Sequence, residues 1–142
     1  VTMKQLFALL FVCGVFSCTS PPDKNTDTAV KMFEAFNTHD WEKMASYYSD
    51  PALFMDPSYG KSFVSKSRKE TVAKYRELQH MFPDVTDQVT GVYPSGNQVI
   101  VEFVSTGTNS EGASFTLPII CVLTFKDGLI IKDATYYDQE NQ

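Results

Sequence analysis

The sequence predicts an α+β domain in which helices come first and an antiparallel sheet follows. Between residues 27 and 82, apolar side chains recur at helical spacing in three segments. From residue 85 onward, apolar runs of strand length are separated by short turns rich in glycine, asparagine and aspartate. Helices followed by a run of strands are typical of a domain whose helices pack on one face of a curved sheet.

Each predicted helix has a polar residue where its N-terminus should lie. Asp27 can cap a helix over residues 27–36, and Asp40 can cap a shorter one over residues 41–48, which Asp50-Pro51 ends. A third helix over residues 67–82 starts with Ser67 three residues before Glu70, which is the pattern of a capping box.

The predicted strands have clear turn signals between them. A short strand over residues 52–55 precedes the third helix, and an antiparallel meander follows it. The meander comprises residues 85–93, 99–106, 113–125 and 129–137. Asp127-Gly128 between the last two strands is a strong hairpin signal.

The start of the chain predicts export and lipid attachment. The apolar run over residues 6–16 is too short to span a bilayer, which needs about 20 residues. It ends in Val15-Phe16-Ser17-Cys18, which resembles the bacterial lipobox. We therefore expect a signal peptide over residues 1–17, a lipidated Cys18 with a proline-rich tether to residue 26, and one domain over residues 27–142. The cell envelope is the expected location, facing the periplasm or at the cell surface; the alternative is a cleaved signal with a fortuitous cysteine.

Composition excludes several classes of function. The chain has 12 basic and 17 acidic residues, a net charge of −5, which argues against nucleic acid as a partner. No phosphate-binding glycine loop or metal-ligand spacing is visible, so we expect no cofactor and no metal. His39 is expected at the surface. Cys121 is the last thiol once Cys13 is removed with the signal and Cys18 is acylated, and it is expected to be buried.

Several short motifs, in order, resemble the SnoaL-like branch of the NTF2-like superfamily. They occupy residues 36–41, 47–57, 82–84, 125–130 and 136–138. The resemblance implies a cone in which three N-terminal helices close over a strongly curved, mostly antiparallel sheet around an apolar pocket. The family includes polyketide cyclases, ketosteroid isomerase-like enzymes and dehydratases, so the fold alone does not determine the function.

The resemblance also directs attention to certain carboxylates. In the cyclases an aspartate on the last strand is the acid–base group, and the resemblance places Thr135 there. Threonine is a poor general base, which argues against cyclase-type chemistry. The remaining catalytic candidates are Asp56, Asp133 and Tyr137. Asp56 could instead cap a turn, Asp133 could be a solvent-facing charge on a strand, and Tyr137 could be an ordinary core aromatic. We also expect a group of side chains to line the pocket or fill the core: Tyr47, Phe54, Tyr75, Phe82, Phe103, Phe115 and Thr135.

Three functions are compatible with these residues. The first is a membrane-anchored domain that binds a small apolar or aromatic molecule in an internal pocket. The second is an isomerase- or dehydratase-like enzyme with Asp56 or Asp133 as acid or base and Tyr137 as hydrogen-bond donor. The third is a homodimeric interaction module, paired through the outer sheet face around Glu102. The sequence does not choose between enzyme and binding protein.

Overall fold

A computed structural model describes residues 23–138 and shows three helices against one six-stranded sheet. The helices are α1 (Lys24–Asn37), α2 (Trp41–Ser46) and α3 (Arg68–Met81), with a short 3₁₀ turn, η1 (Pro57–Tyr59). The strands are β1 (Tyr48–Met55), β2 (Val64–Lys66), β3 (Thr86–Ser95), β4 (Gln98–Thr108), β5 (Ser114–Lys126) and β6 (Leu129–Tyr136).

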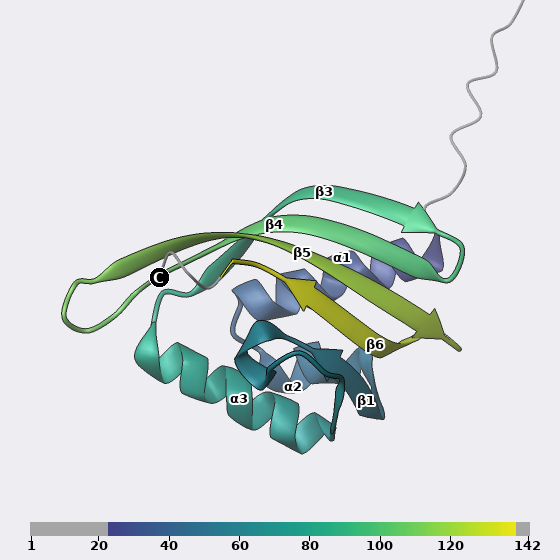
Figure 1. Cartoon of the computed structure of the whole chain (residues 1–142), viewed down its shortest axis with the longest axis horizontal. Coiled ribbons are helices and arrows are strands. Elements are labelled where there is room, and N and C mark those ends of the chain that lie inside the picture. Colours follow the sequence, from purple (N-terminus) through teal and green to yellow (C-terminus); the bar gives the residue numbers. More distant parts are fainter. Residues whose placement is uncertain (1–22, 139–142) are drawn as a thin grey trace, which may run out of the picture.

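The sheet is strongly bent, with the helices on its concave side (Figure 1). Its strand order is β2-β1-β6-β5-β4-β3, and every neighbouring pair is antiparallel except β1 with β6. The α+β class and the mostly antiparallel sheet are therefore confirmed. The expectation of three N-terminal helices needs a correction, because α3 follows β1 and β2 rather than preceding all strands.

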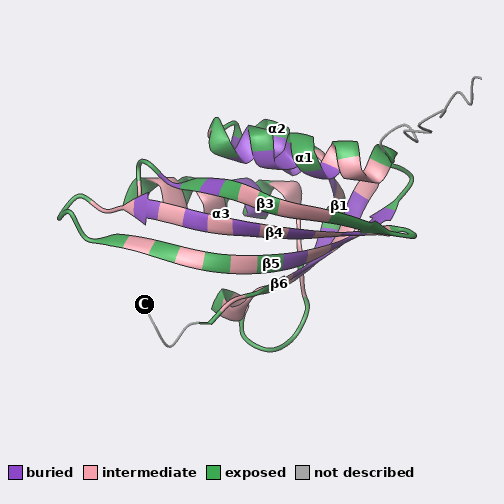
Figure 2. Ribbon diagram, turned by 90° about the horizontal axis from the view of Figure 1, so that it is seen from above, coloured by how far each residue is buried: buried purple, intermediate pink, exposed green. Residues whose placement is uncertain are grey.

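The core lies between α1, α2 and the concave face of the sheet. Strand β4 alternates buried and half-buried residues along its whole length (Figure 2). Val99 and Val101 are among the buried residues. Helix α1 covers this face with Met32, Phe33 and Phe36, and the rings of Phe33 and Phe103 meet edge to face, 4.8 Å apart. These contacts bury one face of α1 against β3 and β4.

The turn chemistry agrees with the sequence. Asp127 and Gly128 both have positive φ, as a two-residue hairpin of this kind requires, and they join β5 to β6. Asp40 accepts a hydrogen bond from the Lys43 amide and caps α2. No side-chain cap forms at the start of α1, which begins at Lys24, so the predicted cap at Asp27 is wrong.

Candidate functional site

A cavity of about 1080 Å³, partly open to solvent, lies between α1, α3 and the sheet. Its lining is mainly apolar and aromatic, with Phe33, Phe36 and Phe103 among its residues. Three aspartates also reach it: Asp56 after β1, Asp87 on β3 and Asp133 on β6. The aromatic side chains of this chain therefore do not fill the space between helices and sheet.

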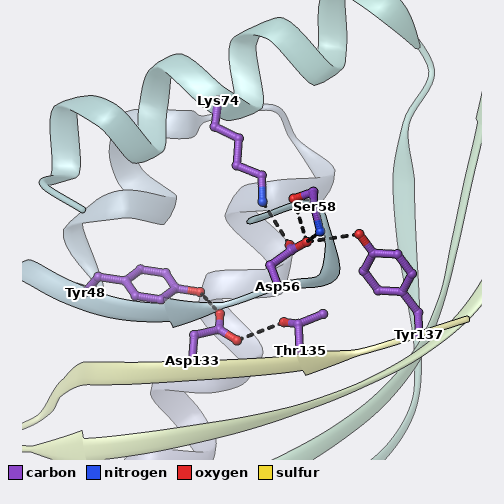
Figure 3. Close-up of polar contacts among 7 residues, drawn as sticks. All are labelled: Tyr48, Asp56, Ser58, Lys74, Asp133, Thr135 and Tyr137. Atoms are coloured by element: carbon purple, nitrogen blue, oxygen red, sulfur yellow. Dashed lines mark hydrogen bonds and ion pairs between the residues drawn. The ribbon is translucent and has the colours of Figure 1, made fainter. Parts of the chain in front are cut away.

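Asp133 is buried on β6, with 7 % of its surface exposed. The Tyr48 hydroxyl donates a hydrogen bond of 2.8 Å to its Oδ2, and the Thr135 hydroxyl donates one of 3.0 Å to its Oδ1 (Figure 3). Burial raises the pKa of Asp133, although these two hydrogen bonds act in the opposite direction. The environment therefore shifts the equilibrium of Asp133 toward its protonated form.

Asp56 ends β1 in a much more polar environment. Its Oδ2 lies 2.9 Å from the Lys74 Nζ, and its Oδ1 accepts hydrogen bonds from the Ser58 amide at 2.8 Å and the Tyr137 hydroxyl at 3.0 Å (Figure 3). Burial alone would raise the pKa of Asp56, but the Lys74 charge and the Ser58 hydrogen bonds together lower it. Asp56 is therefore the ionised carboxylate of the pair.

The two aspartates are brought together by the parallel pairing of β1 with β6. Phe54 is opposite Asp133 and Met55 is opposite Ala134, so Asp56 follows directly beside this part of β6. The Asp56 charge is one of the causes that raise the pKa of Asp133. Two carboxyl groups whose environments move their pKa values in opposite directions are suited to act as an acid and a base.

Sequence analysis missed the third carboxylate, Asp87. It is 5 % exposed, its Oδ1 has no hydrogen-bond partner, and burial raises its pKa to about 7, against a hydrogen bond from Ser105 that lowers it. The Asn37 side chain fixes the backbone of Asp87, donating to its carbonyl and accepting from its amide, each at 2.8 Å. Strand parity could have found Asp87, because it is two residues from the buried Val85.

The structure places most of the predicted pocket residues at the cavity. Those that line it, besides the aspartates, are Tyr75, Phe82, Phe103, Phe115, Thr135 and Tyr137. Phe54 instead packs in the core against the Tyr48 ring, 5.2 Å between centroids, and is not part of the lining. Tyr47 is also absent from the lining and follows α2, where Lys43 lies over its ring.

His39 is not the surface residue that the sequence indicated. It is half-buried, with its Nε2 2.7 Å from the Val85 carbonyl oxygen and its Nδ1 2.9 Å from the Gln79 amide. Its ring stacks on Trp41, beside a second, shallower depression of about 600 Å³. The polar atoms of His39 and Gln79 thus join the loop after α1 to α3 and to the segment before β3.

Residues 23–138 contain no group of three or more His, Cys, Asp or Glu side chains arranged to hold a metal ion. They also contain no helix that is both long and apolar enough to cross a membrane. Cys18 and the preceding residues lie outside the described range.

Comparison with known proteins gave a family and a set of similar folds. Residues 29–132 match the SnoaL-like domain family. IdmH from Streptomyces antibioticus, proposed to be a polyketide cyclase, has a similar structure with a TM-score of 0.71 at 23 % identity, over 82 % of this chain and 93 % of that one. No curated protein matched the sequence.

Two further solved structures have the same fold. A hypothetical protein from Catenulispora acidiphila with a ketosteroid isomerase-like fold, in complex with trimethylamine, has a TM-score of 0.71 at 17 % identity, over 80 % of this chain and 86 % of that one. An NTF2-like protein from Burkholderia pseudomallei has a TM-score of 0.71 at 18 % identity, over 82 % and 92 % of the two chains. Identities this low support a shared fold only.

Proposed function

Because the chain belongs to the SnoaL-like domain family, we propose that it binds a small, mainly apolar or aromatic molecule in the cavity between α1, α3 and the sheet. The open cavity of about 1080 Å³ carries this proposal. Ligand sites are typically concave, largely apolar and supplied with a few convergent polar groups. Aromatic rings from α1 and β4, together with Asp56 and Asp133, match that description.

A matched pair of substitutions tests whether the cavity binds ligands. Ile119 lines the cavity, whereas the next residue, Ile120, does not and is 43 % exposed. Ile119→Trp should fill part of the cavity and weaken the binding of a neutral aromatic probe, N-phenyl-1-naphthylamine, measured by its fluorescence. Ile120→Trp should leave binding unchanged. If both variants and the original protein bind the probe equally well, the probe binds outside the cavity and the proposal is contradicted.

The second candidate is proton transfer next to a carbonyl group, as in an isomerase or dehydratase. An ionised Asp56 and a buried Asp133 in the same cavity support it. Asp56 would accept the proton from carbon, and protonated Asp133 would donate a hydrogen bond to the carbonyl oxygen, where negative charge develops. Tyr137 would hold Asp56 in place through its hydroxyl.

Deuterium exchange tests this candidate directly. The probe is 2-tetralone in D₂O, whose protons next to the carbonyl exchange at a rate that NMR can follow. The protein should accelerate exchange, Asp56→Asn should remove the acceleration, and Glu34→Gln on the exposed side of α1 should retain it. Exchange no faster than in buffer would reject the enzyme and leave the binding proposal standing.

We also propose that the whole chain is exported and anchored to a membrane through a lipid on Cys18. Support comes from the lipobox-like residues 15–18 and the proline-rich segment that follows Cys18 in the sequence. In a bacterial host fed an alkyne-tagged palmitate, the full chain should become labelled. Cys18→Ser should abolish the label, and Cys13→Ser, a cysteine within the signal, should not. Labelling that survives Cys18→Ser would contradict the anchor.

The outer face of the sheet supports a third candidate, homodimer formation. Ile100, Glu102 and Val104 alternate with the inward-facing residues of β4 and are only half-buried. Ile120 lies opposite Glu102 in the register of β4 and β5 and exposes 43 % of its surface. An exposed apolar surface of this kind is suited to pairing with a second copy.

A further inference from the structure

We propose that Asp87 and Ser105 form a second polar subsite of the cavity, which binds the protonated amine of the ligand. This subsite rests on the proposed binding function and narrows its ligand to apolar or aromatic amines. Asp87 on β3 and Ser105 on β4 are directly opposite in the antiparallel register, both are buried, and both line the cavity. The two residues therefore belong to the same part of the cavity wall.

The unpaired oxygen of Asp87 is the observation that points to a ligand. Its Oδ1 is fully buried and has no hydrogen-bond partner, although the residue is held firmly through its backbone by Asn37. A buried acceptor without a donor costs about 1–3 kcal/mol, and more when it is charged. Most buried polar groups in proteins are paired, so such a position calls for an explanation. A donor on a bound molecule would supply the missing partner, with the Asp87 side chain turning so that Oδ1 faces the cavity.

The charges around the cavity favour a cationic donor. Asp56, Asp87 and Asp133 all line the cavity. The pKa of Tyr75 is raised mainly because this residue is buried, and the negative charges of the three aspartates raise it further. Lys74 is the one basic side chain in the described lining, and its ammonium group lies 2.9 Å from Asp56. Lys74 therefore compensates the charge of Asp56, whereas no ion pair among the described residues neutralises Asp87.

The surroundings of Asp87 also suit the apolar part of an amine. Phe103 is two residues from Ser105 on β4 and shares its inward face, and the Phe33 ring packs against Phe103. Aromatic faces attract ammonium groups and accommodate apolar stems. A ligand seated on Phe33 and Phe103 would place its amine at Asp87.

This subsite is separate from the Asp133 group. Asp133 lies opposite Leu123, which lies opposite Val99 on β4, whereas Asp87 lies opposite Ser105. The two aspartates are thus on strands separated by β5 and β4, and they meet β4 at positions six residues apart. Substitution at Asp87 can therefore be tested without altering the contacts of Asp133 with Tyr48 and Thr135.

The test compares three probes of similar shape: 4-phenylbutylamine, 4-phenyl-1-butanol and butylbenzene. Affinities are measured at pH 8, where a carboxyl group with a pKa of about 7 is mostly ionised. The original protein should bind the amine about ten- to a hundredfold more tightly than the alcohol, the range expected for a hydrogen bond to a charged group. Asp87→Asn should remove this preference while leaving the affinity for butylbenzene unchanged. Ser105→Ala, which keeps the charge, should reduce the preference by a smaller factor.

The control is Glu34→Gln on the exposed face of α1, which changes the net charge by the same amount as Asp87→Asn. It should leave the preference for the amine over the alcohol intact. If the original protein binds amine, alcohol and hydrocarbon equally, or if Asp87→Asn retains the preference for the amine, the subsite is wrong and the binding function stands. If Asp87→Asn does not fold, Ser105→Ala becomes the decisive variant. A preference for the amine as large in Ser105→Ala as in the original protein would then overturn the proposal. If none of the three probes binds, both the subsite and the binding function fail.

Discussion

Asp56, Asp133 and Asp87 carry the same side chain, but the protein gives each a different set of hydrogen-bond donors. Asp56 has Lys74, Ser58 and Tyr137 around it, and its pKa is lowered. Asp133 has two hydroxyl donors, and its pKa is raised. Asp87 retains an oxygen with no partner, and its pKa rises to about 7. The pKa values thus follow the extent to which donors compensate for lost water.

The buried Asp87 should make stability depend on pH in a definite direction. Its pKa is about 7 in the folded protein against 3.8 as the ordinary value, so the folded state holds its proton more tightly. The stability associated with this proton is present below about pH 4 and is lost as the pH rises through 7. The loss amounts to at most about 4 kcal/mol. Asp87→Asn does not titrate, so its free energy of unfolding relative to the original protein should rise between pH 4 and pH 8. Urea unfolding over this range measures the difference, and a constant difference would contradict the raised pKa.

Tyr48 should control the protonation of Asp133. Its hydroxyl donates to Asp133 Oδ2, and this bond lowers the pKa of the carboxyl group. Tyr48→Phe should therefore raise the pKa of Asp133 further and lower the free energy of unfolding by about 1–3 kcal/mol, because a buried acceptor loses its donor. Carbon-13 NMR titration of the carboxyl group measures the first effect. Tyr47→Phe, at the neighbouring tyrosine outside the cavity lining, is the control, and it should not move the Asp133 titration.

At the scale of elements, sequence patterns predicted helices, turns and strands best where residues close together in the sequence determine the structure. The capping box at Ser67 and Glu70, the hairpin at Asp127-Gly128 and the long strands all lie close to their expected positions. The first strand was placed at residues 52–55 but begins at Tyr48, because it pairs in parallel with β6, a partner about 80 residues away. Strand β2, only three residues long, was missed because its one partner is β1. Pairings of this kind carry no short-range signal.

The capping box of α3 should stabilise the helix that carries Lys74 and Tyr75 to the cavity. The Ser67 hydroxyl accepts from the Glu70 amide at 3.2 Å, and Glu70 Oε2 accepts from the Ser67 amide at 2.8 Å. Ser67→Ala should lower the free energy of unfolding by about 1 kcal/mol. Ser65→Ala, at an exposed serine in β2, is the matched control. A loss no larger than that of Ser65→Ala in urea unfolding would show that the box contributes little.

At the scale of the whole molecule, the resemblance indicated a cone around a pocket, but the sequence could not show whether that pocket stays open. Openness depends on how aromatic side chains from segments far apart in the chain pack, as Phe33 does against Phe103 and Phe82 against Phe115. Asp56, Asp133 and Tyr137 were found by type and position, and the structure adds that they share one cavity. Asp87 was missed because it is unusual for a strand to direct an unpaired aspartate inward.

The outer face of the sheet yields a prediction about assembly. Ile120 exposes 43 % of its surface and lies between Glu102 on β4 and Tyr136 on β6, which is 52 % exposed. A two-fold pairing of this face would bury these side chains against their own copies. We therefore expect a dimer in sedimentation velocity of the chain lacking residues 1–18, and a monomer after Ile120→Lys, because the pairing would then bury an unpaired ammonium group. Val30→Lys, at a comparably exposed position (38 %) on α1, should leave the dimer intact. If the original protein sediments as a monomer at every concentration, the outer face is not a self-association surface.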